Sequence, residues 1–268
     1  MSVTPADFVA DFVAVESAAI ESLCLLVLAC SYKQGGYCAA GLVVEPDAAG
    51  NWCASAEWLR PVARDGSGCG ALLMTDITCS NGRKVCTGDV VRCQVFAGKG
   101  IAGQPENRVV TGVAWEFLET VDASQIPSLV EQPAHVWLDS CAPSNRVQGC
   151  IVQSGQVQES LMLVQPHNLQ LLLSHRTDFN GKARKRIQAS FDYAGQHYEG
   201  LSVTCPAVSR MLKNRFPVLG GAEVCMTLNK GDQYVLCLSL SPDFNGFHYK
   251  LVAAVYDYDG YLNRTFAH

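Results

Sequence analysis

Strand-length runs of apolar or alternating residues, separated by turns, constrain this chain most strongly. In the first half they are Leu23–Cys30, Ala39–Glu45, Ala71–Cys79, Val85–Phe96 and Val109–Thr120. In the second half they are Gln148–Val152, Ser160–Val164, Leu169–His175, Arg186–Tyr193, His197–Val203, Val224–Leu228, Tyr234–Ser239 and Tyr249–Tyr256. Such runs, bounded by Gly, Asn and Asp, are typical of strands. We therefore predict a mainly β protein.

The runs form two successive groups, and each group contains one short helical segment. The helical segments are Ser124–Gln132 and Pro206–Phe216. Two groups of this size fit two small β-barrels better than one long sandwich. The 268 residues are enough for two domains of roughly 100–150 residues each. We place the boundary near Pro143–Val147, with the first barrel at 23–145 and the second at 146–268.

Residues 1–22 are predicted to form an appended N-terminal helix. Thr4 can cap it, and Pro5 suits the first helical position. An apolar stripe follows, made of Phe8, Val9, Phe12 and Val13. A stripe of this kind docks either on the protein's own core or on a partner chain.

Charge and hydropathy argue against several classes of protein. The formal net charge of −5 argues against a protein that coats duplex DNA through a broad positive field. The first 22 residues carry acids but no lysine or arginine, whereas a secretory signal begins with basic residues. No uncharged apolar run reaches the length of a membrane span. We expect a cytoplasmic protein that has no membrane segment.

The chain has 13 cysteines, which raises the alternatives of zinc binding or a reduced core. Structural zinc sites favour cysteines two to four residues apart, whereas close pairs such as Cys24/Cys30 and Cys79/Cys86 are more widely spaced. Several cysteines alternate with valine or leucine, as in Val224-Cys225-Met226. We predict that they are reduced and serve as small core residues. No metal or cofactor is predicted.

Two runs that place arginine near proline are the clearest candidates for a binding site. They are Trp58-Leu59-Arg60-Pro61-Val62 and Gln104-Pro105-Glu106-Asn107-Arg108. Proline lacks the N–H group that a strand ladder needs. We therefore expect both runs on rigid loops or strand ends, where polar side chains can reach a ligand.

The first run allows two interpretations. Arg60 can bind a phosphate or a carboxylate with two hydrogen bonds, and Trp58 can stack on a base. Alternatively, Trp58 plugs the end of the barrel, and Arg60 pairs with Glu106 or Asp76. Both interpretations remain open from the sequence.

The second run is chemically richer. Gln104 and Asn107 can each donate and accept hydrogen bonds at a base edge, and Arg108 adds a charged group with several donors. The same groups can instead form a buried network that ties a loop to the barrel.

Ser31–Cys38 offers a third candidate site. Its glycines permit close approach of another backbone. Lys33, between Tyr32 and Tyr37, offers one charge with two stacking surfaces. The alternative is a glycine-turned hairpin with solvated side chains.

The strongest concentration of positive charge is Arg176–Arg186. Its charged residues are Arg176, Asp178, Lys182, Arg184, Lys185 and Arg186. Positive charge on a turn that leads into a strand can contact phosphates, and we predict this role for Lys182 and the three basic residues at 184–186. The alternative is a solvated hairpin that only favours solubility.

The sequence contains no recognisable catalytic set. The Gly-x-Ser-x-Gly and His-Glu-x-x-His motifs are absent, and the six histidines are scattered. We assign no catalytic residue and expect a binding protein rather than an enzyme.

Four motifs occur in order along the chain. They are Leu28–Lys33 with Cys38–Gly41, the run at 58–62, the run at 104–108, and Tyr249–Val255. Together they resemble the bacterial dual OB-containing domain family over residues 23–256. The resemblance implies two tandem OB-like barrels. It carries over as candidate ligand-binding residues Lys33, Trp58, Arg60, Gln104, Glu106, Asn107, Arg108 and Lys250.

The resemblance also implies a function. The family is linked to prokaryotic antiphage defence, and the OB fold implies binding of single-stranded nucleic acid or a nucleotide. OB grooves combine aromatic platforms with a positive track, which Tyr32, Trp58 and the basic segment can supply. Two alternatives remain. One is an adaptor subunit of a defence complex that docks through the N-terminal helix, and the other is a nucleotide-processing enzyme that uses Glu106 as acid or base.

Overall fold

The structure is a computed structural model that describes residues 18–33, 35–64, 70–98, 100–101, 103–177, 181, 183–216, 224–228 and 234–257. The predicted N-terminal helix lies outside these residues except at its last positions, where Ile20 already begins a strand. The chain forms two compact units that divide between Asp122 and Ala123, earlier than the boundary expected from the sequence.

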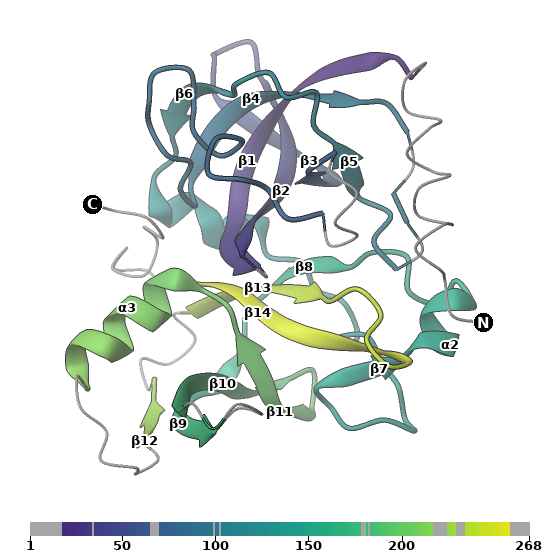
Figure 1. The fold of residues 1–268 in the computed structure, drawn as a ribbon, viewed down its shortest axis with the longest axis vertical. Coiled ribbons are helices and arrows are strands. Elements are labelled where there is room, and N and C mark those ends of the chain that lie inside the picture. The colour runs from purple at the N-terminus through teal and green to yellow at the C-terminus, as the bar shows by residue number, and fades with distance from the viewer. Residues whose placement is uncertain are drawn as a thin grey trace. The chain divides into compact units, whose positions relative to one another are not determined.

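The first unit is one six-stranded sheet (Figure 1). Its strands are β1 (Ile20–Lys33), β2 (Gly36–Pro46), β3 (Trp52–Val62), β4 (Asp89–Phe96), β5 (Asn107–Val109) and β6 (Glu116–Thr120). They lie in the order β5-β3-β2-β1-β4-β6. The long strand β1 organises the unit because it pairs with β2 on one edge and with β4 on the other. Its central residues, including Leu25 and Val27, are fully buried.

The second unit contains an eight-stranded sheet and most of the helical residues. After the 3-10 helix η2 (Ala123–Leu129) come β7 (Arg146–Gln148), α2 (Gly149–Gln153), β8 (Leu161–Val164), β9 (His167–Thr177), β10 (Ala183–Tyr193), β11 (Gln196–Val203), α3 (Pro206–Arg215), β12 (Val224–Thr227), β13 (Tyr234–Leu240) and β14 (Phe247–Asp257). Seven of these strands lie in the order β12-β9-β10-β11-β14-β13-β8, and β7 pairs with β14 outside this path.

The two units share one strand path. In each, three strands form an antiparallel meander, and a later strand runs parallel to the third strand of that meander. β5 is parallel to β3 in the first unit, and β14 is parallel to β11 in the second. The helix α3 stands between the third and fourth strands of this path in the second unit. This connectivity is that of the OB fold, a five-stranded, partly open Greek-key barrel.

The structure describes two sheets that are not closed into barrels, an arrangement consistent with the predicted tandem OB-like units. In the first unit, the single bridge between Val95 and Val110 links β4 to the residue after β5, and the Thr111 N–H donates to the Gln94 carbonyl at 3.1 Å. The strand β5 is only three residues long, too short to complete a ladder. In the second unit the sheet path ends at β12 and β8. The mainly β composition is confirmed.

Four segments differ from the strands and helices predicted from sequence. Val109–Thr120 is not one strand, because β5 ends at Val109 and β6 begins only at Glu116. No strand was predicted for residues 52–57, yet β3 begins at Trp52. The first half of β3 alternates between half-buried and exposed residues. Ala71–Cys79 forms turns rather than a strand, although Leu72 and Ile77 are fully buried. Gln148–Val152 is not a strand, since residues 149–153 form the short helix α2. Apolar content alone identified burial in the last two cases, but not backbone conformation.

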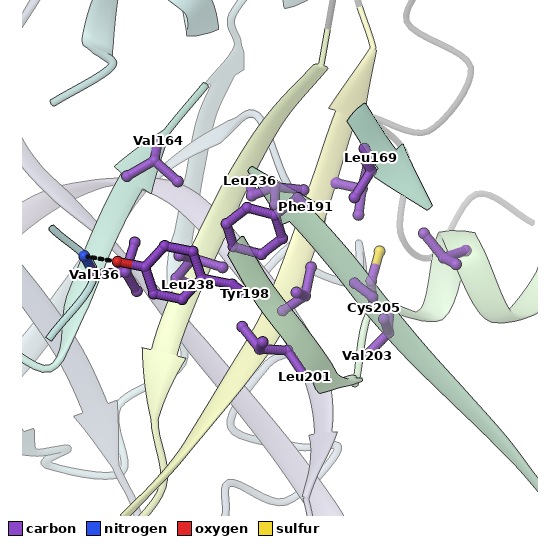
Figure 2. Packing of buried hydrophobic residues seen from close by; sticks show 14 of the residues in the cluster. Val136, Val164, Leu169, Phe191, Tyr198, Leu201, Val203, Cys205, Leu236 and Leu238 are labelled. Atoms are coloured by element: carbon purple, nitrogen blue, oxygen red, sulfur yellow. Dashed lines mark hydrogen bonds between the residues drawn. The ribbon is translucent and has the colours of Figure 1, made fainter. Parts of the chain in front are cut away.

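Each unit has its own apolar core. In the second unit the Phe191 and Tyr198 rings stack with their centroids 5.4 Å apart, surrounded by apolar residues such as Leu201 and Leu236 (Figure 2). The Tyr198 hydroxyl accepts a hydrogen bond from the Val136 N–H at 2.9 Å (Figure 2). This bond satisfies the phenol at the edge of the core.

Candidate nucleic-acid interface

The two proline–arginine runs lie side by side on the parallel strands β3 and β5. Arg60 pairs in register with Asn107, and Pro61 pairs with Arg108. The first run is therefore the end of a strand, and only part of the second is a loop. Pro61 is tolerated because the β2–β3 ladder ends at Leu59, so the side of the strand that Pro61 faces needs no N–H donor.

Arg60 is an internal residue, 1% exposed. Its Nη2 atom lies 3.0 Å from Glu106 Oε1, and the carboxylate is also buried. The Arg60 N–H donates to the Glu106 carbonyl at 3.0 Å, so backbone and side chain join the same two residues. Of the alternatives left open by the sequence, the structure therefore shows the pairing of Arg60 with Glu106. The other partner considered, Asp76, instead accepts a hydrogen bond from the Leu73 N–H at 2.7 Å.

The amides of the second run extend this pair into a network. Arg60 Nη1 donates to Asn107 Oδ1 at 3.5 Å, and Asn107 Nδ2 donates to Gln104 Oε1 at 3.0 Å. Arg108 Nη1 donates to the carbonyls of Pro105 and Asn107 at 2.8 and 3.0 Å. The groups of this run therefore hold the segment that enters β5 against the end of β3. Trp58 is buried next to this network on β3.

The β1–β2 hairpin presents aromatic side chains at the surface. Tyr32 and Tyr37 are cross-strand partners, and their ring centroids are 5.5 Å apart with a 44° angle between the planes. Tyr32 is 60% exposed. Lys33 pairs in register with Gly36 at the end of the ladder. The hairpin thus places an exposed ring beside the position of a lysine.

A segment outside the sheet fixes this hairpin. The Tyr37 and Leu72 backbones exchange two hydrogen bonds of 2.8 Å each. Gly36 is required for this approach, because a Cβ atom there would lie 2.6 Å from the Leu72 carbonyl oxygen. The bound segment continues into Leu73 and Met74, which are also exposed. The exposed side chains of Tyr32, Leu73 and Met74 therefore belong to two segments whose backbones are hydrogen-bonded to each other.

The basic segment forms the β9–β10 hairpin of the second unit. Arg184 pairs in register with Arg176, and Arg186 pairs with Ser174. Lys185 is exposed and Arg186 is half-buried, while Lys182 lies outside the described residues. The structure therefore brings cationic residues of both strands to neighbouring register positions.

The turn between β13 and β14 contains an aromatic residue that the sequence reasoning missed. Phe244 is 62% exposed, and its ring centroid lies 6.4 Å from that of Tyr249. The turn is tight, since Asn245 and Gly246 both have positive φ angles of 55° and 81°. A phenylalanine directly before Asn-Gly was the available signal, because this dipeptide marks a hairpin turn where few buried residues occur.

Lys250, on β14, lies inside the second unit. It is 3% exposed, and its Nζ atom is 5.1 Å from the centroid of the Tyr198 ring. Burial lowers the pKa of Lys250 to about 8, against the opposing effect of the Asp139 carboxylate. This residue is separate from the Arg60 network, which belongs to the first unit.

The cysteines and metal-ligating residues do not form a second site in the described chain. The prediction of core cysteines holds only in part: Cys30, Cys79, Cys93, Cys205 and Cys237 are buried, whereas Cys53, Cys141, Cys150 and Cys225 are exposed. Burial raises the pKa of Cys79 to about 11 and that of Cys93 to about 12, so these thiols stay protonated near neutral pH. Among the described residues no cluster of His, Cys, Asp or Glu could hold a metal ion. Nor does any described helix have the length and apolar character of a membrane span.

Comparison with known proteins identifies the family. The dual OB-containing domain family matches residues 24–255. The chain belongs to this family. No curated protein matches the chain. Among solved structures, the chain has 11% identity to a deletion mutant of the single-stranded DNA binding protein from Thermus aquaticus, over 89% of this chain and 92% of that chain. The TM-score of 0.17 is too low to support an argument.

In both units, the surface residues described above lie at equivalent strand connections of the OB fold. OB folds bind oligonucleotides with the face of strands 2 and 3 and with the loops that join strands 1–2 and 4–5. In this chain the strand 1–2 connections are the β1–β2 and β9–β10 hairpins. The strand 4–5 connections are the segment from β4 to β5 and the β13–β14 turn. The exposed rings and the basic residues described above lie at these connections.

Proposed function

We propose that this protein binds single-stranded nucleic acid through the strand 1–2 and strand 4–5 connections of its two OB units. The observation that carries the proposal is the exposed Tyr32 ring, held beside Tyr37 on the β1–β2 hairpin. Stacking on such a ring is tolerant of sequence, because every base has a π face. The proposal includes Lys33 as a phosphate contact next to that ring.

The second unit supports the same function, because it offers positive charge and an exposed aromatic ring at its own strand connections. Its strand 1–2 hairpin carries the cationic residues at positions 176 and 184–186. Its strand 4–5 turn carries the exposed Phe244 ring. A positive track with an aromatic platform is the combination that single-strand binding grooves use. We propose that Lys182 and residues 184–186 contact phosphates.

The buried residues of the first unit act on binding indirectly in this proposal. Arg60, Glu106 and Asn107 bond to one another, and Arg108 bonds to carbonyls of its own segment. We propose that these groups fix the entry into β5, including Gln104, so that the strand 4–5 segment keeps its shape. Trp58, buried beside them, supports the same segment from β3.

Fluorescence anisotropy with a labelled oligothymidine tests the stacking role. Tyr32→Ala should weaken binding by about 5- to 150-fold, since stacking contributes about 1–3 kcal/mol per base. Tyr32→Phe keeps the ring and should bind like the wild type. If Tyr32→Ala binds as tightly as Tyr32→Phe, or if the wild type binds no single strand at low salt, the proposal is wrong. Competition by a mononucleotide at equal affinity would redirect the function to nucleotide binding.

Salt titration of the same complex tests the charge role. Replacing Arg184, Lys185 and Arg186 by alanine should flatten the dependence of log K on log salt, because each phosphate contact contributes about 0.7 to the slope for single strands. Arg92→Ala is the matched control, since Arg92 is an exposed arginine that pairs with Glu116 in the first unit. A slope that stays the same in the triple variant would contradict the phosphate contacts.

The family resemblance adds the cellular context to this proposal. We propose a role in bacterial antiphage defence that depends on nucleic-acid binding. Expression in a bacterial host challenged with a phage panel should lower plaque numbers, and Tyr32→Ala should lose the protection. Equal protection by wild type and Tyr32→Ala would separate the defence role from the proposed site.

A further inference from the structure

Corresponding positions of the two units carry opposite charges. Glu106 immediately precedes the parallel ladder of β5 with β3, and Lys250 immediately precedes that of β14 with β11. Both residues are buried. In the first unit the third strand supplies the balancing charge, Arg60, opposite Asn107. In the second unit the corresponding position of the third strand is Ser202, opposite Leu251. The buried lysine thus has no counter-charge at the place where the first unit has one.

Next to Lys250, in the turn before β7, Asn145 has a buried side-chain oxygen that accepts no hydrogen bond from the described residues. The Lys250 N–H donates to the Asn145 carbonyl at 2.9 Å, which extends the β7–β14 register by one residue and places both side chains on one face of the sheet. Asn145 Nδ2 donates to the Gly200 carbonyl at 3.5 Å, whereas its Oδ1 atom is buried without a hydrogen bond in the described structure. A buried acceptor of this kind costs free energy unless a ligand or water satisfies it.

Within the described residues, the Lys250 ammonium forms no ion pair or hydrogen bond with a protein group. Its described contact is the Tyr198 ring. The Asp139 carboxylate influences Lys250 but accepts hydrogen bonds from the Cys141 N–H and from Gln148. Asn145, in the turn before β7, and Gly200, on β11, are only half-buried. The site therefore lies just beneath the surface.

We propose that Lys250 and Asn145 form a binding site for a phosphate-type oxyanion that also carries a hydroxyl group. The Nζ ammonium donates to the anionic oxygens, and the hydroxyl donates to Asn145 Oδ1. Inorganic phosphate has both groups, and so does the 3′-terminal nucleotide of a DNA strand, which has a phosphodiester and a free 3′-hydroxyl. An internal DNA nucleotide has an anionic phosphodiester but no hydroxyl, so the site selects free phosphate or a 3′ strand end over internal DNA positions. Only the strand-end source rests on the proposed function.

Anion binding at this site should be coupled to the uptake of a proton by Lys250. The titratable groups near Lys250 are Tyr198 from β11 and Asp139 from the segment before β7. His248 lies two residues earlier on the same face of β14, with its ring nitrogens near the Ser241 carbonyl and the Asp243 carboxylate. Since burial lowers the pKa of Lys250 to about 8, part of the amine is neutral at that pH. A bound anion favours the charged amine, so binding takes up a proton.

Isothermal titration calorimetry with inorganic phosphate tests the site. At pH 8 the heats in two buffers of different ionisation enthalpy should differ, which shows proton uptake. Affinity should fall as pH rises from about 7 to about 9. Lys250→Met should weaken binding by about tenfold or more, because charge-assisted hydrogen bonds are lost. Asn145→Leu should weaken it less. Lys84→Met, a lysine of the first unit, is the matched control and should leave binding unchanged.

The control measurements keep the outcomes distinct. Circular dichroism should show that Lys250→Met folds, since it replaces a buried charge by an apolar chain. Equal phosphate binding by Lys250→Met and wild type, or binding without proton uptake, overturns the proposal, as does the absence of phosphate binding. A DNA oligonucleotide with a free 3′-hydroxyl that binds wild type more tightly than its 3′-dideoxy form, while Lys250→Met binds both forms equally, identifies the strand end as the source. If Tyr32→Ala loses oligonucleotide but retains phosphate, the two sites are independent.

Discussion

The Arg60–Glu106 pair predicts a large loss of stability when one partner is neutralised. Both side chains are buried, with 3.0 Å between Nη2 and Oε1. Glu106→Gln leaves the guanidinium charge in place but removes the carboxylate that balances it. Breaking a buried pair from one side costs about 3–5 kcal/mol, which is a large part of the roughly 5–15 kcal/mol that keeps a domain folded. We expect about 3 kcal/mol, because glutamine keeps the shape and one acceptor.

Urea unfolding followed by tryptophan fluorescence measures this loss, since Trp58 and Trp115 are buried in the first unit. Glu116→Gln is the matched control, because its pair with Arg92 is about half-exposed at both ends and is screened by solvent. The double variant Arg60→Met/Glu106→Leu should recover most of the stability, since it leaves no unpaired buried charge. If Glu106→Gln unfolds like Glu116→Gln, the pair does not hold β5 to β3, and the reasoning fails.

Three other perturbations have expected outcomes. Asp89→Ala should lower the free energy of unfolding by about 3 kcal/mol in urea titrations, because the buried carboxylate accepts a 2.7 Å hydrogen bond from Arg83 and bonds to charged groups contribute about 1.5–3 kcal/mol each. The pKa of Lys250 is lowered from 10.5 to about 8 in the folded protein. Between these two pH values the unfolded chain therefore binds more protons than the folded chain. Stability should therefore rise as pH increases from 8 to 10.5, and Lys250→Met should lack this part of the rise. In a thiol-reactivity assay under native conditions, the exposed Cys53, Cys141, Cys150 and Cys225 should react first. Buried Cys93, whose pKa is about 12, should react only on unfolding.

Local sequence patterns predicted most strands but not β3. Its first half carries Trp52, Cys53 and Ser55 with mixed exposure, and Pro61 lies near its end. A proline is compatible with a strand only where the neighbouring ladder has ended, and the end of that ladder at Leu59 is set by residues elsewhere in the chain. The same limit applies to Leu72, which is buried against the Tyr37 backbone rather than within a strand. Such non-local pairing is invisible to a short sequence window.

In the candidate sites, too, the sequence predicted some contacts and missed others. The sequence could propose that Arg60 meets Glu106, because arginine and glutamate are complementary, but it could not choose between Glu106 and Asp76. The choice depends on the parallel register of β3 with β5. Tyr32 and Tyr37 were predictable as a pair, since a short glycine turn joins them. The exposed Phe244 was not identified, because a single aromatic residue in a turn carries no periodicity.

The central position of β14 has a consequence for biosynthesis. This strand lies between β11 and β13 in the sheet, although it follows both in the sequence. A nascent chain that ends before Phe247 contains the strands on both sides of β14 but lacks the strand that joins them, so the second unit cannot complete its sheet during most of its own synthesis. Every described strand of the first unit is complete by Thr120, so this unit is free to fold first, as is usual for N-terminal units. Ribosomes stalled between these two points should therefore display a protease-resistant first unit followed by a cleavable second one.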